Sequence, residues 1–248
     1  RIKLGINKNH TLIGNSGRDH PMKDHFTFVE SAFFLRKKNK NIKFLILGKG
    51  IKKNQNLLRK IKLNKLEEHI ILLEPDSVEI NHIYQMLDLF CLTSSDSEGF
   101  PNVLVESIIN NTLTVSTDVG DSRKIVNQNE LIIPIKKPKL IADKLNKIIL
   151  FNNEKKIELL KNLKDNLSNF SLDLVSKKFL HIYQNTILNC QGNEINEIGL
   201  VPLTKDLKSP GDRRRFSYFL QKKKIPFKII DNIQSHKIVF LTQQADIT

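Results

Sequence analysis

The segment Glu98–Glu106 combines two acidic side chains with a glycine and a proline at a spacing that suits ligand binding. It follows an expected strand at Leu87–Thr93. Gly99 lets a ligand approach the backbone closely, and Pro101 is suited to the first turn of a helix. The N–H groups of Phe100–Val103 would then have no helical acceptor and would form an anion site.

Glu106 belongs to a narrow polar stripe of the helix expected after Pro101. The stripe comprises Asn102, Glu106 and Asn110, and it lies opposite Leu104, Val105, Ile108 and Ile109. Glu106 therefore faces either solvent or a cleft. A carboxylate can accept two hydroxyl hydrogen bonds, as from a ribose, but amphipathic helices also carry solvated glutamates. Both interpretations stay open on the sequence alone.

A second candidate segment, Gly14–His25, lies just beyond the first expected strand and contains Gly17, Arg18 and Lys23. Two cations at the start of a helix suit a diphosphate, because each charge-assisted hydrogen bond contributes about 1.5–3 kcal/mol. The alternative is that the loop is basic by chance. We interpret His20 and His25, in the same loop, as solvated side chains.

Two shorter segments also follow expected strands. Gly48-Lys49-Gly50 matches neither a Walker loop nor a dinucleotide fingerprint, because the required further residues are missing. The segment Thr117–Asp121 follows the expected strand Leu113–Thr117. Ligands in open α/β sheets bind beyond the carboxyl ends of the strands, so all four segments are expected at one edge.

The elements that would position these segments alternate between short apolar runs and helical stretches. The expected strands are Thr11–Asn15, Lys43–Leu47, His69–Leu73, Leu87–Thr93, Leu113–Thr117 and Leu131–Ile135. The first helix is expected from about Pro21 to Lys38, with Met22, Phe26, Val29 and Phe33 on one face. This alternation predicts an α/β fold with a Rossmann-like, doubly wound parallel sheet.

The C-terminal part has a different pattern. Residues 138–189 predict two or three closing helices without a strand, and 191–198 is a polar linker. Residues 199–248 predict a short strand, a basic helix and two strands at Phe227–Ile230 and Lys237–Thr242. We therefore expect one domain at 1–190 and the partial start of a second α/β domain at 199–248.

The composition restricts the class of protein and its partners. The 248 residues include 40 Lys and Arg and 26 Asp and Glu, giving a net charge of +14, and two cysteines. Two cysteines cannot form a disulfide framework. The basic residues are spread over exposed helical positions without interleaved aromatic residues, so nucleic acid is not an expected partner. Peripheral contact with an anionic membrane surface is the more favoured use of the charge.

The order and spacing of the segments resemble the donor-binding, C-terminal half of GT-B glycosyltransferases of the GT4 type (glycosyl transferases group 1). The matching motifs are Gly17-Arg18 with Lys23, the Glu98–Glu106 segment and the Thr117–Gly120 turn, within residues 1–189. The resemblance implies a retaining transferase that is independent of metal and of any cofactor. Its donor substrate would be a UDP- or GDP-sugar.

The resemblance also implies a role for each site residue. Arg18 and Lys23 would bind the donor diphosphate and act in catalysis with Glu98, which would contact sugar hydroxyls. The backbone of Gly99, Phe100, Pro101, Asn102 and Val103 would meet sugar and phosphate, with Gly17 close by. Glu106 would hold the ribose, and the base would lie near Gly48 and the loop after Leu73. No metal ligand set is expected.

Two departures from the family leave alternatives open. Arg123 and Lys124 stand where the family often has a glutamate, and Ile108–Asn111 replaces small residues.

The N-terminal GT-B domain that binds a glycan or lipid-linked acceptor is not in the sequence, so we expect an inactive fragment of a bacterial, cytoplasmic cell-envelope polysaccharide enzyme. The tail resembles the start of a second transferase domain. The alternative is a degenerate, non-catalytic module for assembly or membrane recruitment.

Overall fold

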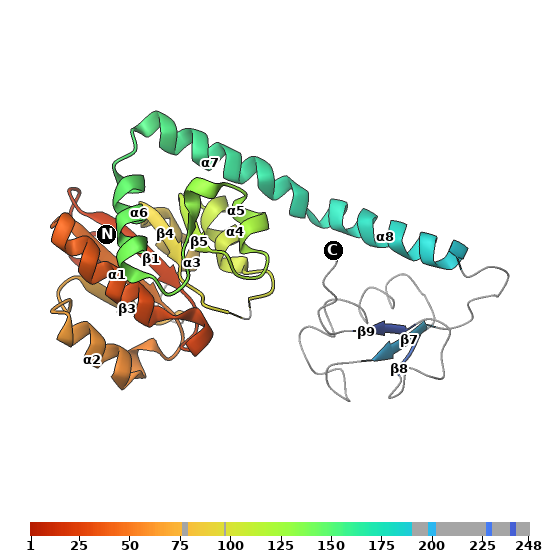
Figure 1. Cartoon of the computed structure of the whole chain (residues 1–248), viewed down its shortest axis with the longest axis horizontal. Helices are drawn as coiled ribbons and strands as arrows, with labels where there is room; N and C mark the ends of the chain where they lie inside the picture. The colour runs from red at the N-terminus through yellow and green to blue at the C-terminus, as the bar shows by residue number, and fades with distance from the viewer. Residues whose placement is uncertain (76–78, 97, 190–197, 202–226, 230–238, 242–248) are drawn as a thin grey trace. The chain divides into compact units, whose positions relative to one another are not determined.

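The computed structural model describes residues 1–75, 79–96, 98–189, 198–201, 227–229 and 239–241 (Figure 1). These residues form two compact units, Arg1–Ser171 and Leu172–Thr248. The first unit contains all four candidate segments. The boundary expected at residue 190 stays a prediction, because residues 190–197 lie outside the described ones.

A six-stranded, entirely parallel sheet forms the centre of the first unit. Its strands are β1 (Thr11–Ser16), β2 (Ile42–Leu47), β3 (Ile70–Leu73), β4 (Leu89–Leu92), β5 (Thr114–Thr117) and β6 (Ile132–Ile133). They lie in the order β3-β2-β1-β4-β5-β6, so the chain reverses direction across the sheet between β1 and β4. The predicted doubly wound fold is confirmed, and this reversal is the switch point where such sheets bind ligands.

Two groups of helices flank the sheet. Their bounds are α1 (His25–Lys38), α2 (Gln55–Leu63), α3 (Ile80–Met86), α4 (Asn102–Ile109), α5 (Ser122–Val126), α6 (Pro138–Ile149) and α7 (Asn153–Leu167). Short 3₁₀ turns are η1 (Ile2–Leu4), η2 (Pro21–Lys23), η3 (Ile51–Lys53), η5 (Asn129–Leu131) and η6 (Ser168–Phe170). Helix α1 packs on α2 and α6, whereas α4 packs on α3, α5 and α7 (Figure 1).

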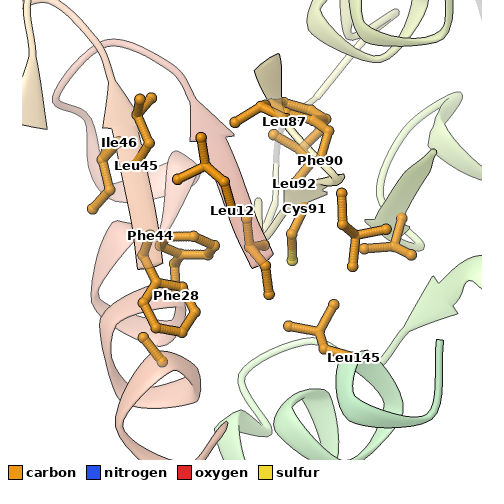
Figure 2. Packing of buried hydrophobic residues seen from close by; sticks show 14 of the residues in the cluster. Leu12, Phe28, Phe44, Leu45, Ile46, Leu87, Phe90, Cys91, Leu92 and Leu145 are labelled. Carbon is orange, nitrogen blue, oxygen red and sulfur yellow. The ribbon is translucent and has the colours of Figure 1, made fainter. Parts of the chain in front are cut away.

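The core lies between the sheet and these helices. All residues of β4 and β5 are buried, as expected for parallel strands covered on both faces. Phe28 of α1 meets Phe44 of β2 edge to face, with ring centroids 6.0 Å apart (Figure 2). Burial raises the pKa of the Cys91 thiol well above its ordinary value.

The prediction for the first helix is wrong at its N-terminal end, both in where the helix begins and in which side chains are buried. Pro21 opens the 3₁₀ turn η2 rather than α1, and Asp24 caps α1 by accepting a hydrogen bond from the Thr27 N–H. The buried stripe is Phe28, Val29, Ala32 and Leu35. Phe26 is 38% exposed, because two helical positions before Phe28 it points to the opposite side.

The second unit contains helix α8 (Leu172–Asn189) and strands β7 (Ile198–Val201), β8 (Phe227–Ile229) and β9 (Val239–Leu241). The strands form a parallel sheet in the order β8-β7-β9. With α6 and α7, α8 confirms three helices over residues 138–189. The predicted basic helix falls within 202–226, outside the described residues. In the described part of the chain, no helix has the length and apolar content needed to cross a membrane.

Candidate functional site

Backbone hydrogen bonds bring the four candidate segments to one edge of the sheet. Gly17 donates to the Leu47 carbonyl at the end of β2, at 2.9 Å, and Ser95 donates to the carbonyl of Met22, at 2.8 Å. Asp121 donates to the carbonyl of Gly99, at 2.9 Å. The loops after β1, β2, β4 and β5 are therefore linked to one another at the carboxyl edge of the sheet, around the switch point.

Lys23 and Glu98 form an ion pair across the switch point. The Lys23 Nζ to Glu98 Oε1 distance is 2.5 Å, and the two side chains are only 14% and 7% exposed. The hydroxyl of Ser94 donates to the same carboxylate oxygen, at 2.5 Å. A Cβ on Gly17 would lie 2.9 Å from Lys23 Cδ, so the glycine makes room for the lysine stem. The structure thus unites two predicted site residues.

Two further glycines let the loops approach one another. A Cβ at Gly48 would lie 1.8 Å from the carbonyl oxygen of Gly17, which no side chain permits. Gly120 has a φ of 56°, and a Cβ there would lie 1.9 Å from the carbonyl oxygen of Glu98. The β5–α5 turn therefore supports the Glu98–Gly99 backbone directly.

Glu106 is exposed on α4 and accepts a hydrogen bond from the hydroxyl of Tyr84, at 3.0 Å. Tyr84 is buried in α3, and its pKa is raised by burial first and by the Glu106 charge second. The described residues provide no hydrogen bond between Glu106 and the Lys23–Glu98 pair. The sequence did not reveal Tyr84, because nothing in its spacing distinguishes it from an ordinary core aromatic.

The expected apolar side of α4 is wrong at one position. Leu104 and Ile108 are buried, but Ile109 is 63% exposed. Ser107 is buried in its place, because its hydroxyl bonds to the Leu104 carbonyl and to Thr114. The N-terminus of α4 follows Pro101 and has no side-chain cap; the anion site there stays a prediction.

The remaining predicted residues border the same edge. Arg18 and Asn102 are exposed, Val103 is half-buried and Pro101 is buried. The guanidinium of Arg18 makes no hydrogen bond to the described residues. The ring of Phe100 lies 5.3 Å from that of Phe170. The roles of all these residues toward a donor stay predictions.

His25 differs from its expected state. The side chain is 3% exposed and its two ring nitrogens contact Asn15 and the carbonyl oxygens of Gly17 and Arg18. Burial lowers the pKa of His25 below its ordinary value of 6.5, against the opposing effect of the two carbonyls. The interpretation of a solvated loop histidine is therefore wrong, since the short turn η2 directs residue 25 inward.

The two basic residues that depart from the family pattern are held by neighbouring acids. Arg123 Nε lies 2.6 Å from Asp118 Oδ2, and Lys124 Nζ lies 3.0 Å from Asp121 Oδ1. All four side chains are at least 40% exposed. Their ion pairs are local to the β5–α5 turn.

A small cavity of about 100 Å³ lies at the opposite edge of the sheet, near Thr11, Asp88 and Leu113 at the amino ends of their strands. It is therefore separate from the candidate site. Among the described residues, no group of His, Cys, Asp or Glu side chains could hold a metal ion.

The family model described as "Glycosyl transferases group 1" matches residues 1–169. The chain belongs to this family. No curated protein matches the sequence significantly. The C-terminal domain of a group 1 glycosyltransferase (LpcC) from Francisella tularensis is 25% identical with a TM-score of 0.56, over 64% of this chain and 85% of that one.

Two longer solved glycosyltransferases of the GT-B fold share the same architecture over part of their length. HepE from Anabaena, solved with UDP and glucose, is 18% identical with a TM-score of 0.64, over 74% of this chain and 50% of that one. TarM from S. aureus is 22% identical with a TM-score of 0.61, over 71% of this chain and 36% of that one. This group 1 chain thus spans half or less of these two transferases. The predicted resemblance to GT-B glycosyltransferases is confirmed.

Proposed function

We propose that the group 1 chain binds the donor in a retaining glycosyltransferase that moves a sugar from a UDP- or GDP-sugar to a glycan or lipid-linked acceptor. The Lys23–Glu98 pair at the β1/β4 switch point carries the proposal, since it presents a cation and a hydroxyl acceptor side by side. The solved complexes of HepE and of the pneumococcal transferase GtfA contain UDP, which supports a nucleotide donor.

Lys23 and Arg18 would bind the donor diphosphate. An ammonium has three donors, so Lys23 can keep its bond to Glu98 and still donate to a phosphate oxygen. When the bond between the sugar and the diphosphate breaks, negative charge develops on the leaving phosphate, and these cations stabilise it. We propose that they make a metal ion unnecessary.

The other predicted residues would bind the nucleotide sugar through hydrogen bonds and backbone contacts rather than through a positive side chain at the phosphate. Glu98 would accept sugar hydroxyls, and the backbone of Gly99–Val103 would line sugar and phosphate. Glu106, held by Tyr84, would accept ribose hydroxyls. Gly17 and Gly48 admit the close approach of the loops that would lie beneath the nucleotide.

We further propose a place in bacterial cell-envelope polysaccharide synthesis, in the cytoplasm and in contact with the inner face of the membrane. The net charge of +14 supports contact with anionic lipid. The acceptor would bind to a second domain.

Thermal shift with UDP-glucose, UDP-GlcNAc and GDP-mannose tests the donor assignment. We expect at least one of these to raise the melting temperature, and Arg18→Ala and Glu106→Ala to abolish the shift. Lys60→Ala is the control, because Lys60 pairs with Glu30 on the helices α2 and α1, away from the site. A degenerate module would show no shift with any nucleotide sugar and would bind anionic vesicles in a salt-dependent way.

A further inference from the structure

A chain of buried polar side chains lies beneath the loop after β1. Asn15, His25 and Thr93 are 1%, 3% and 0% exposed. They connect the end of β4 to the carbonyl groups of Gly17 and Arg18. Buried polar groups need hydrogen-bond partners of the right kind, so the direction of each bond can be worked out.

The donors and acceptors in this series of hydrogen bonds can be assigned starting from Thr93. Its single hydroxyl proton points to the carbonyl oxygens of Asp24, at 3.1 Å, and Lys23, at 3.3 Å. Thr93 Oγ1 must therefore accept from the Asn15 amide, whose Nδ2 lies 3.2 Å away and also 2.8 Å from the Cys91 carbonyl. The other end of that amide, Oδ1, is an acceptor and faces His25.

His25 consequently meets acceptors on both sides. Its Nδ1 lies 2.9 Å from Asn15 Oδ1, and its Nε2 lies 3.1 Å and 3.3 Å from the carbonyl oxygens of Gly17 and Arg18. A neutral imidazole has one N–H and one lone pair, so either tautomer leaves a lone pair facing an oxygen. Only the imidazolium form satisfies every contact in this surrounding.

Burial opposes that charged form. Desolvation is the largest influence on the pKa of His25 and lowers it, and the nearby Lys23 charge lowers it further. The carbonyls of Arg18 and Gly17 and the carboxylate of Asp19 raise it. The polar group of Asn15, which contacts the ring, and that of Thr93 are neutral. The other charged groups on the surrounding loops are the Arg18 guanidinium, the capping carboxylate of Asp24, and Glu98, which is paired with Lys23. A bound diphosphate would add negative charge and raise the pKa.

We propose that His25 is a positioning residue that holds Gly17 and Arg18 in the diphosphate-binding conformation, and that it takes up a proton from solvent when a nucleotide sugar binds. The proton goes to the ring nitrogen that lacks one, which converts the unfavourable contact into a hydrogen bond. This inference rests on the proposed function, because it requires an anionic donor at Arg18 and Lys23.

Isothermal titration calorimetry of the 248-residue chain with UDP-glucose and GDP-mannose at pH 7 tests this proposal. Their diphosphates are esterified at both ends and do not titrate near this pH. In buffers of different ionisation enthalpy we expect the wild type to take up a substantial fraction of one proton per ligand bound. His25→Gln, checked for folding by circular dichroism, is expected to take up none and to bind at least about fivefold more weakly.

His82→Gln is the matched control, because His82 is exposed on α3; its proton uptake is expected to equal that of the wild type. Binding without proton uptake by the wild type overturns the inference and leaves the proposed function standing. If no nucleotide sugar binds, the proposed function fails. The inference is then decided by nitrogen NMR of His25 with inorganic pyrophosphate, where a ring that stays singly protonated overturns it.

Discussion

The ammonium of Lys23 lies 2.5 Å from the carboxylate of Glu98, although the two residues are 75 positions apart in the chain. The pair exists because β1 and β4 are neighbours in the sheet, so that the loops that follow them meet at the same edge. It is mostly buried, and Ser94 supplies a further hydrogen bond to the carboxylate. The site proposed for an anionic sugar donor thus has a fixed cation before any ligand arrives.

Replacing Lys23 by Ala removes the best-placed cation of the site. Loss of a charge-assisted hydrogen bond of about 1.5–3 kcal/mol predicts an affinity for a nucleotide sugar that is lower by roughly 10- to 150-fold. Calorimetric titration measures it. Lys60→Ala removes a lysine that is paired between helices and should leave the affinity unchanged. Equal binding by both variants would show that Lys23 does not contact the donor.

Gly120 supports the Glu98 backbone, and alanine there should destabilise the protein. The left-handed φ alone costs roughly 1–2 kcal/mol for a residue with a Cβ. Gly5 is a matched control, because its φ is 66° and nothing lies within 4 Å of a Cβ there. Urea unfolding should show a larger loss for Gly120→Ala than for Gly5→Ala, since the carbonyl of Glu98 must also move. Equal losses would mean that the turn does not press on Glu98.

Tyr84→Phe removes the hydroxyl that holds Glu106. We expect a loss of about 1 kcal/mol in the free energy of unfolding, typical of one hydrogen bond. If Glu106 binds ribose, the wild type should bind UDP more tightly than 2′-deoxy-UDP, and Tyr84→Phe should reduce that preference. Glu106→Gln, alone and combined with Tyr84→Phe, measures the coupling between the two residues. An additive double variant would count against a positioning role for Tyr84.

The pH dependence of stability should reflect His25. Its folded pKa lies below 6.5, so below pH 6.5 the unfolded chain binds more protons than the folded one, and the free energy of unfolding decreases as the pH falls. His69 acts in the same direction, because burial lowers its pKa too. Urea titrations between pH 7.5 and 5, conditions chosen to span this ordinary value, should therefore show a shallower decline for His25→Gln. A decline as steep as that of the wild type would mean that His25 does not contribute to the pH dependence.

Much of the fold follows from local pattern. Short apolar runs separated by helical stretches predict a parallel sheet, and the observed strands overlap every expected one in the first unit. The strands β4 and β6 are shorter than the apolar runs that predict them, because the pairing with neighbouring strands ends where the backbone enters the flanking loops. The helix α1 was less predictable, since its start depends on the turn η2 and on the cap formed by Asp24.

By itself, the sequence determined the order of the elements and the motif residues at the carboxyl ends of the strands, because both depend on chemistry along the chain. The tertiary structure alone decided which of these residues meet. It pairs Lys23 with Glu98, places the Tyr84 hydroxyl where it donates to Glu106, and buries His25 among hydrogen-bond acceptors. Such contacts depend on the order of the strands in the sheet and on how the loops pack within an ångström or so. The residue types along the sequence do not show either of these.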